Sequence, residues 1–369
     1  MPAEFRIFLN NQQADEEQTG AFGQIRVDQA IGLATEAEME MEISPDENGR
    51  WSGINEEFAQ PFQRIRVEVK VGEDDFRPLI DGPVVGQRFE VSATPCESKM
   101  TLIVHDDSVL MNRRETVRLF EEQTASDIAM LLFQEEGFTA EVDTVDDPGA
   151  TLERTIVQRG TAMQLLRELA RRHGMYVYVK AGETPGNSVG YFGKPDLSAR
   201  DYPELILLGS ERNFNKMNVE FDGLRPVEAS SRTVIAADQS GSASEAFLPT
   251  QEPLGEMGAH DLVEPGTVLL ARTREEANDV TAAAQAAVDY SSWAYSAQIE
   301  IDAAIFPAVL APFKVVSIGG AGGHLSGDYM VSRVTHTLSN GGYRQKVGLR
   351  RNARSDGSGG NGGIPGGIF

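Results

Sequence analysis

Residues 36–43 (EAEMEMEI) alternate strictly between carboxylates and apolar side chains. Taken singly, Glu, Ala and Met all favour helices. A repeat of two, however, separates an apolar face from a charged face only when the chain is extended, because a helix would spread the carboxylates around its axis. The segment therefore predicts a half-buried β-strand that carries a row of four glutamates on one face.

Residues 64–71 (RIRVEVKV) repeat this alternation with mostly basic side chains on the polar face. We expect the two segments to be neighbouring strands, because each opposite-charge pair across strands stabilises a sheet by about 0.2–1 kcal/mol and penalises a slipped register. The glutamate row would then lie across from a basic row on an outer sheet face. A substrate-binding row of carboxylates is the alternative, but runs of charge usually mark solvated faces.

The composition limits the classes of partner. Acidic residues number 56 against 33 basic ones, which gives the 369-residue chain a net charge of -23. Phosphate binding needs clustered Lys and Arg, so we expect no sequence-specific nucleic-acid binding, although DNA or other anionic cargo can pass an acidic surface without adsorbing. The single cysteine, Cys96, forms no intramolecular disulfide and fits synthesis in a reducing cytoplasm. We expect neither a secretory signal nor a transmembrane segment, which would need roughly 20 apolar residues.

The first hundred residues predict a β module. Besides the two alternating segments, short strands are expected at residues 76–84, 87–93 and 99–105, separated by Gly, Pro and Asp turns. Short strands at this spacing are typical of a small barrel or sandwich.

The period then becomes helical. Residues 124–138 predict a helix with a cap candidate at Ser126 and a glycine near its end. Residues 160–180 predict a second helix, capped by Thr161, stopped by Gly174 and followed by a strand. Two helix–Gly–strand units in succession indicate a small α/β module.

The rest of the chain predicts a second β module. Residues 230–264 are rich in Ser, Gly and Pro and predict a long surface insertion, whereas the Ala-rich residues 273–291 predict a helix. Residues 353–369 form a Gly-rich tail that we expect to be flexible unless a partner orders it. Strands are expected at residues 204–208, 213–221, 297–301, 313–318, 328–338 and 343–349.

The fold class expected from this order is α+β, mainly β, with two β-barrel modules flanking a small α/β module. The expected boundaries are an N-terminal barrel over residues 1–115, the α/β module over 116–200, the second barrel over 201–352 and the tail from 353.

The most chemical-looking cluster is His105-Asp106-Asp107, because imidazole and carboxylates can bind a metal or share a proton. Neighbouring side chains of an extended chain point apart, however, and Asn112 and the Arg113–Arg114 pair offer the aspartates ordinary partners. We therefore favour a structural role for the cluster.

Residues 317–323 (SIGGAGG) have the composition of a phosphate-binding loop, but a strand pattern follows them instead of a helix, so we expect a hairpin loop. Motifs of serine hydrolases, zinc proteases and P-loop enzymes are missing from the sequence. We assign no catalytic, cofactor-binding or metal-binding residue, and we do not expect an enzyme.

Several segments, in order along the chain, resemble the baseplate hub proteins of contractile phage tails, including late control protein D, and the hub half of type VI secretion spike proteins. In the helix motif of that family Gln158 and Thr161 are in place, whereas Ala162 stands where an Asp is usual. The resembling segments are residues 79–84 (LIDGPV), 102–115 (LIVHDDSVLMNRRE), 124–138 (TASDIAMLLFQEEGF), 157–179 (VQRGTAMQLLRELARRHGMYVYV) and 325–352 (LSGDYMVSRVTHTLSNGGYRQKVGLRRN).

The resemblance implies a structural protein and a ring-shaped homotrimer that joins a threefold central spike to a sixfold tail tube and forms part of the central conduit. The expected partners are a separate spike protein, the tail tube or a tube-initiator protein, and other baseplate components. The expected location is the tail baseplate of a virion or an injection-system particle, assembled in the bacterial cytoplasm. The acidic composition suits a conduit whose lumen is predominantly acidic.

Two other classes stay open at this point. A tail-associated cell-wall hydrolase would need a positioned acid and base in a cleft. A carbohydrate-binding β protein would usually expose aromatic platforms, for which Trp51 and Trp293 are the only tryptophans.

Overall fold

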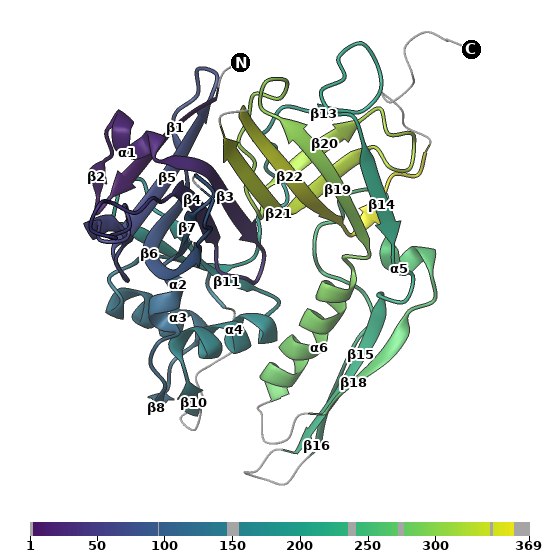
Figure 1. The fold of residues 1–369 in the computed structure, drawn as a ribbon. Helices are drawn as coiled ribbons and strands as arrows, with labels where there is room; N and C mark the ends of the chain where they lie inside the picture. The colour runs from purple at the N-terminus through teal and green to yellow at the C-terminus, as the bar shows by residue number, and fades with distance from the viewer. Residues whose placement is uncertain are drawn as a thin grey trace.

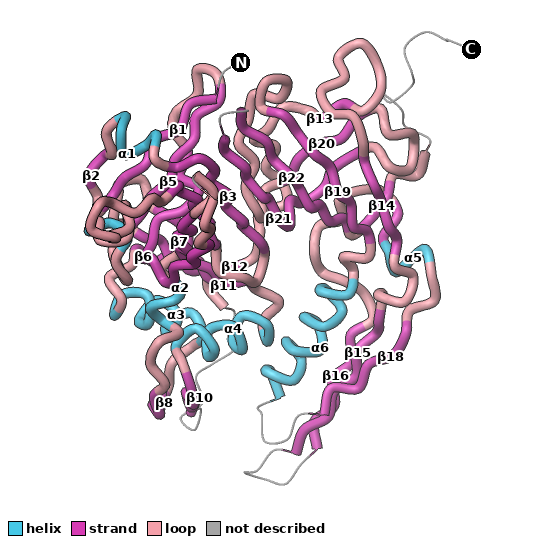
Figure 2. Tube along the Cα trace, in the orientation of Figure 1, coloured by secondary structure: helices cyan, strands magenta, loops and turns pink. Residues whose placement is uncertain are grey.

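The computed structural model describes residues 3–94, 96–145, 155–234, 241–271, 277–339 and 342–357, and these are mainly β. Figure 1 shows two β halves side by side, with helices below them. Figure 2 shows the same division, with the longer helices at one end of the strands and shorter helices beside each half. None of the helices in these ranges is long and apolar enough to cross a membrane. The last twelve residues of the Gly-rich tail, 358–369, lie outside the described residues.

Most strands belong to one sheet that runs through both halves, and nearly all of its pairings are antiparallel. Two short strands, β13 (Leu205–Ile206) and β20 (Val315–Gly319), branch from β21. The main path, in spatial order, is β14 (Met217–Phe221), β19 (Tyr295–Asp302), β22 (Gly342–Arg351), β21 (Gly327–Ser339), β3 (Phe22–Ala30), β4 (Glu36–Glu42), β7 (Lys99–His105), β6 (Arg77–Glu90), β5 (Arg64–Val71), β1 (Ala3–Leu9) and β2 (Gln12–Gln13).

This topology corrects the prediction of two barrel modules. The path is open, since it ends at β14 and β2, and no closed barrel is present in the described part of the chain. The physical reason is the pairing of β21 with β3 from Arg333 and Ala30 to Ser339 and Gln24. The outer edges of β21 and β3 therefore join the two halves into one continuous sheet.

The alternating segment that begins at Glu36 forms the strand β4, as its alternation predicted. Ala37, Met39 and Met41 of β4 are buried, whereas the glutamates are exposed or half-buried. Its predicted neighbour is wrong, however: β4 pairs with β3 and β7, and β5 pairs with β1 and β6. Opposite charge alone did not select the partner, because each strand meets its counter-charges elsewhere.

One long strand, β6, replaces the two strands predicted at residues 76–84 and 87–93. Up to Pro83 it pairs with β5, and from Val84 onward it pairs with β7. Gly82 makes this crossing feasible, because a Cβ atom there would lie 1.9 Å from the backbone oxygen of His105. The Gly-Pro pair marks a change of partner and not the end of a strand.

The helices follow the predicted helical period. In α3 (Ala125–Glu135) the cap is Thr124, which forms a capping box with Asp127, so the prediction of Ser126 as the cap is wrong. The Ser126 hydroxyl instead donates a 2.8 Å hydrogen bond to the Asp143 carbonyl. Thr161 caps α4 (Ala162–Arg172) as predicted. The other helices are α1 (Glu16–Gly20), α2 (Ser108–Met111), α5 (Ala259–Leu262), α6 (Ala277–Ser291) and the 3-10 turn η1 (Glu57–Ala59).

Small sheets complete the fold. The segment 230–264 was predicted to be a surface loop, but it contributes to a three-stranded sheet whose one side packs on α6. Its Ser-rich strands show little apolar periodicity, because α6 covers only one face of this small sheet. The small sheets are β8 (Thr116–Glu121) with β10 (Thr155–Gly160); β9 (Thr139–Val142), β11 (Tyr176–Ala181) and β12 (Ser188–Gly193); β15 (Val227–Val234), β16 (Gly241–Ala246) and β18 (Gly266–Ala271); and β17 (Met257–Gly258) with β23 (Ala353–Arg354).

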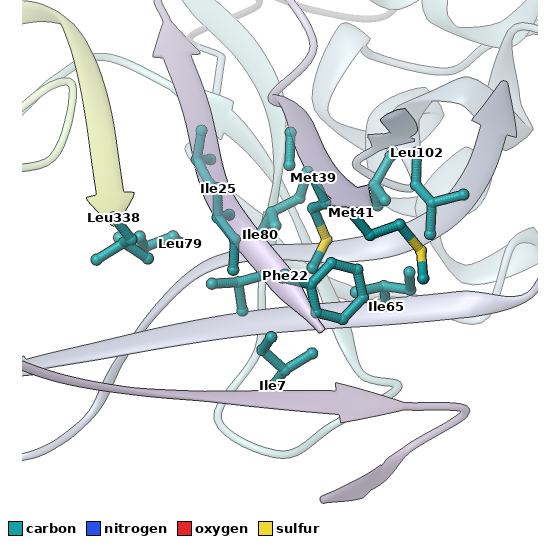
Figure 3. Packing of buried hydrophobic residues seen from close by; sticks show 14 of the residues in the cluster. Ile7, Phe22, Ile25, Met39, Met41, Ile65, Leu79, Ile80, Leu102 and Leu338 are labelled. Atoms are coloured by element: carbon teal, nitrogen blue, oxygen red, sulfur yellow. The ribbon is translucent and has the colours of Figure 1, made fainter. Parts of the chain in front are cut away.

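Separate hydrophobic cores lie under the two halves and within the helical region. In the first half, Met39, Ile65 and Leu102 pack between the strands that carry them, as Figure 3 shows. Leu338 of β21 also belongs to this core, so the second half contributes a side chain to the first. The joined sheet is therefore supported by shared apolar packing as well as by hydrogen bonds.

The two halves have the same strand order. Numbered by chain position, each runs first, second, fourth, third along the sheet: β3, β4, β7, β6 in one half and β14, β19, β22, β21 in the other. In each half one more strand, β5 or β20, pairs with the third. The elements β15 to α6 lie between β14 and β19, where the first half has only the turn between β3 and β4.

Candidate interaction surfaces

The His105-Asp106-Asp107 cluster does not converge on one site. The Nε2 atom of His105 lies 2.9 Å from a carboxylate oxygen of Glu36 on β4. Asp106 is buried and accepts hydrogen bonds from the backbone N–H groups of Thr35 and Ser108. Burial raises the pKa of the Asp106 carboxyl, although these hydrogen bonds oppose the shift.

Asp107 belongs to a buried ionic network instead. The guanidinium of Arg64 binds Asp107 through a 2.6 Å contact and Asp81 through another 2.6 Å contact. Arg66 binds Asp81 at 3.1 Å and Glu68 at 2.6 Å. The expected partners Asn112, Arg113 and Arg114 are thus wrong for both aspartates. No group of three or more metal-ligating side chains in the described ranges could hold a metal ion.

This network fastens the α/β region to the first half. Arg66 donates hydrogen bonds of 2.8 Å, 3.1 Å and 3.3 Å to the carbonyls of Gly182, Glu183 and Thr184 in the turn between β11 and β12. The Ser188 hydroxyl of β12 donates a 2.7 Å hydrogen bond to Asp107. The polar face of β5 is therefore an internal interface. The alternating sequence predicted this strand but gave no sign that its charged face is covered.

The glutamate row of β4 is charge-paired on the exposed face of the large sheet. Glu40 lies 2.6 Å from the Lys99 ammonium, and Glu38 lies 3.2 Å from the Arg88 guanidinium. These cations come from the neighbouring β7 and β6. The row therefore stabilises the sheet by cross-strand pairing, which is the reading favoured from the sequence.

Further along the same face lies a groove of about 580 Å³ over β3, β21, β22 and β19. Arg26, Arg333, Arg344 and Lys346 line it, together with Glu300. Arg333 is paired with Asp28, whereas Arg344 and Lys346 make no ion pair within the described ranges. The exposed sheet face thus carries charges of both signs: an acidic row on β4 and a basic group on β22.

A buried polar cluster lies where the halves join. His336 of β21 is fully buried, with Nδ1 2.7 Å from the Tyr343 hydroxyl and Nε2 3.2 Å from Oε1 of Gln29. Because the Gln29 amide nitrogen donates to the Leu79 carbonyl, its Oε1 atom accepts from His336, which assigns the imidazole proton to Nε2. Burial lowers the pKa of His336 to about 3.

This pKa makes stability depend on pH. The unfolded chain binds a proton at His336 below about pH 6.5, and the folded chain does not until about pH 3, so folding free energy is lost as the pH falls through this window. We expect the free energy of unfolding, measured with urea, to fall more steeply with decreasing pH in the wild type than in His336→Gln. Between about pH 6 and pH 4 the two slopes should differ by about 1.4 kcal/mol per pH unit. Equal slopes in the two proteins would contradict a buried neutral imidazole.

The remaining features singled out from the sequence are a Gly-rich segment, the two tryptophans and the single cysteine. Residues 317–319 end β20, and residues 320–323 begin the loop that joins β20 to its antiparallel partner β21, so the predicted hairpin is present. Trp293 is 3% exposed and Trp51 packs against the first core, so neither is an exposed aromatic platform. Cys96 is a free, exposed thiol.

The model of one protein family, described as the Alg8 N-terminal domain, matches residues 4–340. The chain belongs to this family. The matched range includes the first half of the large sheet, the α/β region and the second half as far as β21, whereas β22 lies beyond it. The family description names a domain and states no activity. No curated protein sequence matches this member of the Alg8 N-terminal domain family.

Solved structures share the fold along almost the whole chain. The tail protein from Neisseria meningitidis MC58 is 13% identical, with a TM-score of 0.65 over 95% of this chain and 97% of that one. The 43 kDa tail protein of prophage MuSo2 from Shewanella oneidensis is 16% identical, with a TM-score of 0.64 over 95% and 98%. The E. coli c3393 protein, a type VI secretion component similar to the T4 tail proteins gp27 and gp5, is 10% identical, with a TM-score of 0.57 over 94% and 76%.

These structural neighbours are two tail proteins and a component of a type VI secretion system, and they establish the fold of this family member. At these identities the likeness is one of architecture. It agrees with the resemblance noted from the sequence at the level of tail-related proteins.

Proposed function

We propose that this chain is the structural baseplate hub of a contractile tail or injection machine, where it adapts a threefold central spike to a sixfold tail tube. The observation that carries the proposal is the repeated strand order of the two sheet halves. Three copies of such a chain present six similar four-stranded units around an axis, whereas their overall symmetry remains threefold. A heterologous contact that repeats with the right rotation closes such a ring.

The exposed face of the joined sheet is the surface that would line the conduit. It carries the glutamates of β4 and also the cations Arg344 and Lys346 of β22. A conduit with this lining has a mixed wall, so the proposal replaces the predominantly acidic lumen expected from the net charge. Neighbouring charges of both signs still disfavour lasting adsorption of passing DNA or protein, because a polyanion meets repulsive and attractive positions in turn.

The partners follow from this role. They are two further copies of the chain, a spike protein on the threefold side, the tail tube or a tube initiator on the sixfold side, and other baseplate components. The full-length likeness to two tail proteins and the likeness to a type VI secretion component similar to both gp27 and gp5 support this set. The proposed location is the tail baseplate of the assembled particle.

The proposed role is structural and not catalytic. The carboxylates that the sequence singled out are occupied by cations: Glu40 by Lys99, and Asp107 by Arg64. We expect no release of soluble fragments when the purified full-length chain is incubated with peptidoglycan. Hydrolysis that depends on a pair of acidic residues in this chain would contradict the proposal and favour a tail-associated hydrolase.

Labelling of particles tests the location directly. A particle assembled with an epitope-tagged chain should carry the label at one end, where the tail tube meets the spike, and particles should fail to assemble when the gene is deleted. Label along the tube or on fibres, or normal assembly without the chain, would contradict the hub role.

A further inference from the structure

Two of the unpaired edges of the large sheet, in the part of the chain that the structure describes, are β14 and the last residues of β6. β14 pairs with β19 on one side, and no described strand pairs with its other side. From Gly86 to Glu90, β6 pairs with β7 on one side and again with no described strand on the other. Unpaired edges offer a row of backbone donors and acceptors to another strand. Beside them, Phe89 and Val91 are 42% and 63% exposed.

The repeated strand order indicates what pairs there. Following directly opposed residues across the four strands gives one row in each half. Both rows cross the four strands in the same spatial order, which is first, second, fourth and third. The rows are Ile25, Met39, Leu102 and Gln87 in the first half, and Met217, Ile299, Val347 and Val334 in the second.

A shared irregularity supports this alignment. The register of β6 against β7 shifts between Val84 and Gly86, and the register of β21 against β22 shifts between Val331 and Arg333. Each shift lies just before the row residue of its strand. The halves therefore agree in strand order, in row and in the position of a bulge, a feature that re-aims a strand.

The halves differ at the outer edge of the third strand. In the second half the third strand, β21, goes on to pair with β3, the first strand of the other half. In the first half the third strand, β6, has no such partner, and the corresponding first strand, β14, is the free edge. We propose that β6 of one copy pairs with β14 of a second copy in the manner of β21 with β3. This deepens the hub proposal and rests on it, because the contact repeats to close the ring.

The observed junction also fixes the register. Leu338 lies four residues beyond the row in β21 and pairs with Ile25. Val91 lies four residues beyond the row residue Gln87 and directly follows the end of β6, so its partner is Met217. The pairs across the new contact are Val91 with Met217, Glu90 with Asn218, Phe89 with Val219, and Arg88 with Glu220.

Side-chain chemistry fits this register. Phe89 and Val91 take the places of His336 and Leu338, which are 0% and 2% exposed in the observed junction. The exposed apolar side chains would therefore become buried in the contact, and exposed apolar patches commonly mark such contact sites. On the other face, Arg88 would lie across from Glu220, and opposite charges in directly opposed positions stabilise a strand pair.

Disulfide trapping tests the register. In a Cys96→Ser background, the pair Arg88→Cys and Glu220→Cys should form intermolecular disulfides under mild oxidation, because directly opposed residues bring their Cβ atoms within bonding range. Reducing-agent-sensitive dimers and closed trimers are expected on denaturing gels. The matched pair Arg88→Cys and Val219→Cys places the thiols on opposite faces and should give little product. Equal yields from both pairs would overturn the register.

A second variant separates this inference from the hub role. Phe89→Asp with Val91→Asp should shift the full-length chain from trimer to monomer, weakening association by about a hundredfold, without altering its circular dichroism, since both side chains are exposed in the single chain. Leu224→Asp, at a residue that is 93% exposed, is the control. A trimer that survives the double change would overturn the β6–β14 contact but leave the hub role standing. Correctly formed particles that lack this chain would refute the hub role itself.

Discussion

Replacing Arg66 by Met should lower the free energy of unfolding by about 3–5 kcal/mol, because it leaves buried carboxylates without their counter-charge. Arg66 is 1% exposed and lies between Glu68 and Asp81, which are also buried. The change also removes its hydrogen bonds to the carbonyls of the β11–β12 turn. Urea unfolding measures the effect, and loosening of the α/β region should show as faster amide exchange in residues 182–186.

The matched control for this change is Arg88→Met. Arg88 pairs with Glu38 on the exposed sheet face, and an exposed pair contributes no more than about 1 kcal/mol. Arg88 was also placed across the proposed contact between copies, so the comparison uses a protein concentration at which both variants are monomeric. A loss below about 1 kcal/mol for Arg66→Met would contradict the network's role in joining the two regions.

Gly82→Ala should destabilise the fold by about 3 kcal/mol or more, at the upper end of what overpacking costs. The added Cβ would lie 1.9 Å from the His105 oxygen and 3.0 Å from the Asp106 Cα, so the neighbouring backbone would have to move. Since this is where β6 changes partner, its two pairings would be strained together. The measurement is again the urea midpoint at constant slope.

Gly86→Ala is the control on the same strand. Its added Cβ would meet only the Ile103 side chain, at 3.4 Å, and a small shift of that side chain accommodates it. We expect a change within about 1 kcal/mol. Equal effects of the two substitutions would mean that the crossing at Gly82 tolerates a side chain.

Local features of the fold could be predicted from the sequence. The alternation in β4 gave the strand and its buried face, because side-chain direction in an extended chain depends only on position. The helical period and Thr161 gave α4 and its cap in the same way. At α3, Thr124 and Ser126 are both chemically able to cap, and the choice depends on Asp127 completing the capping box.

Long-range pairing could not be predicted by the same reasoning. The charges of β4 and β5 are complementary, but Lys99 and Arg88 meet the glutamates of β4, while Asp81 and Asp107 meet the arginines of β5. Complementary charge is satisfied by any suitable neighbour, so it does not select one strand. The buried network was missed for a related reason: its cover comes from a turn more than a hundred residues away in the chain.

The free edges could not be recognised from the sequence either. Phe89 and Val91 follow a Gly-Pro crossing and read as part of one more short strand. Only the comparison of the two halves assigns them a partner, because β21 and β3 provide the paired form of the same edge. The sequence did contain a signal, because Phe89 and Val91 are apolar residues at alternate positions and no other predicted strand is available to cover them.

We expect that three copies of this chain, each contributing two similar sheet units, form one ring in the baseplate. The most direct test is the mass and symmetry of baseplates isolated from assembled particles, measured by native mass spectrometry with image averaging of the same sample. The expected result is three copies of the chain in a threefold ring with six similar units around the conduit. A ring of six whole chains, or one or two copies per baseplate, would contradict it.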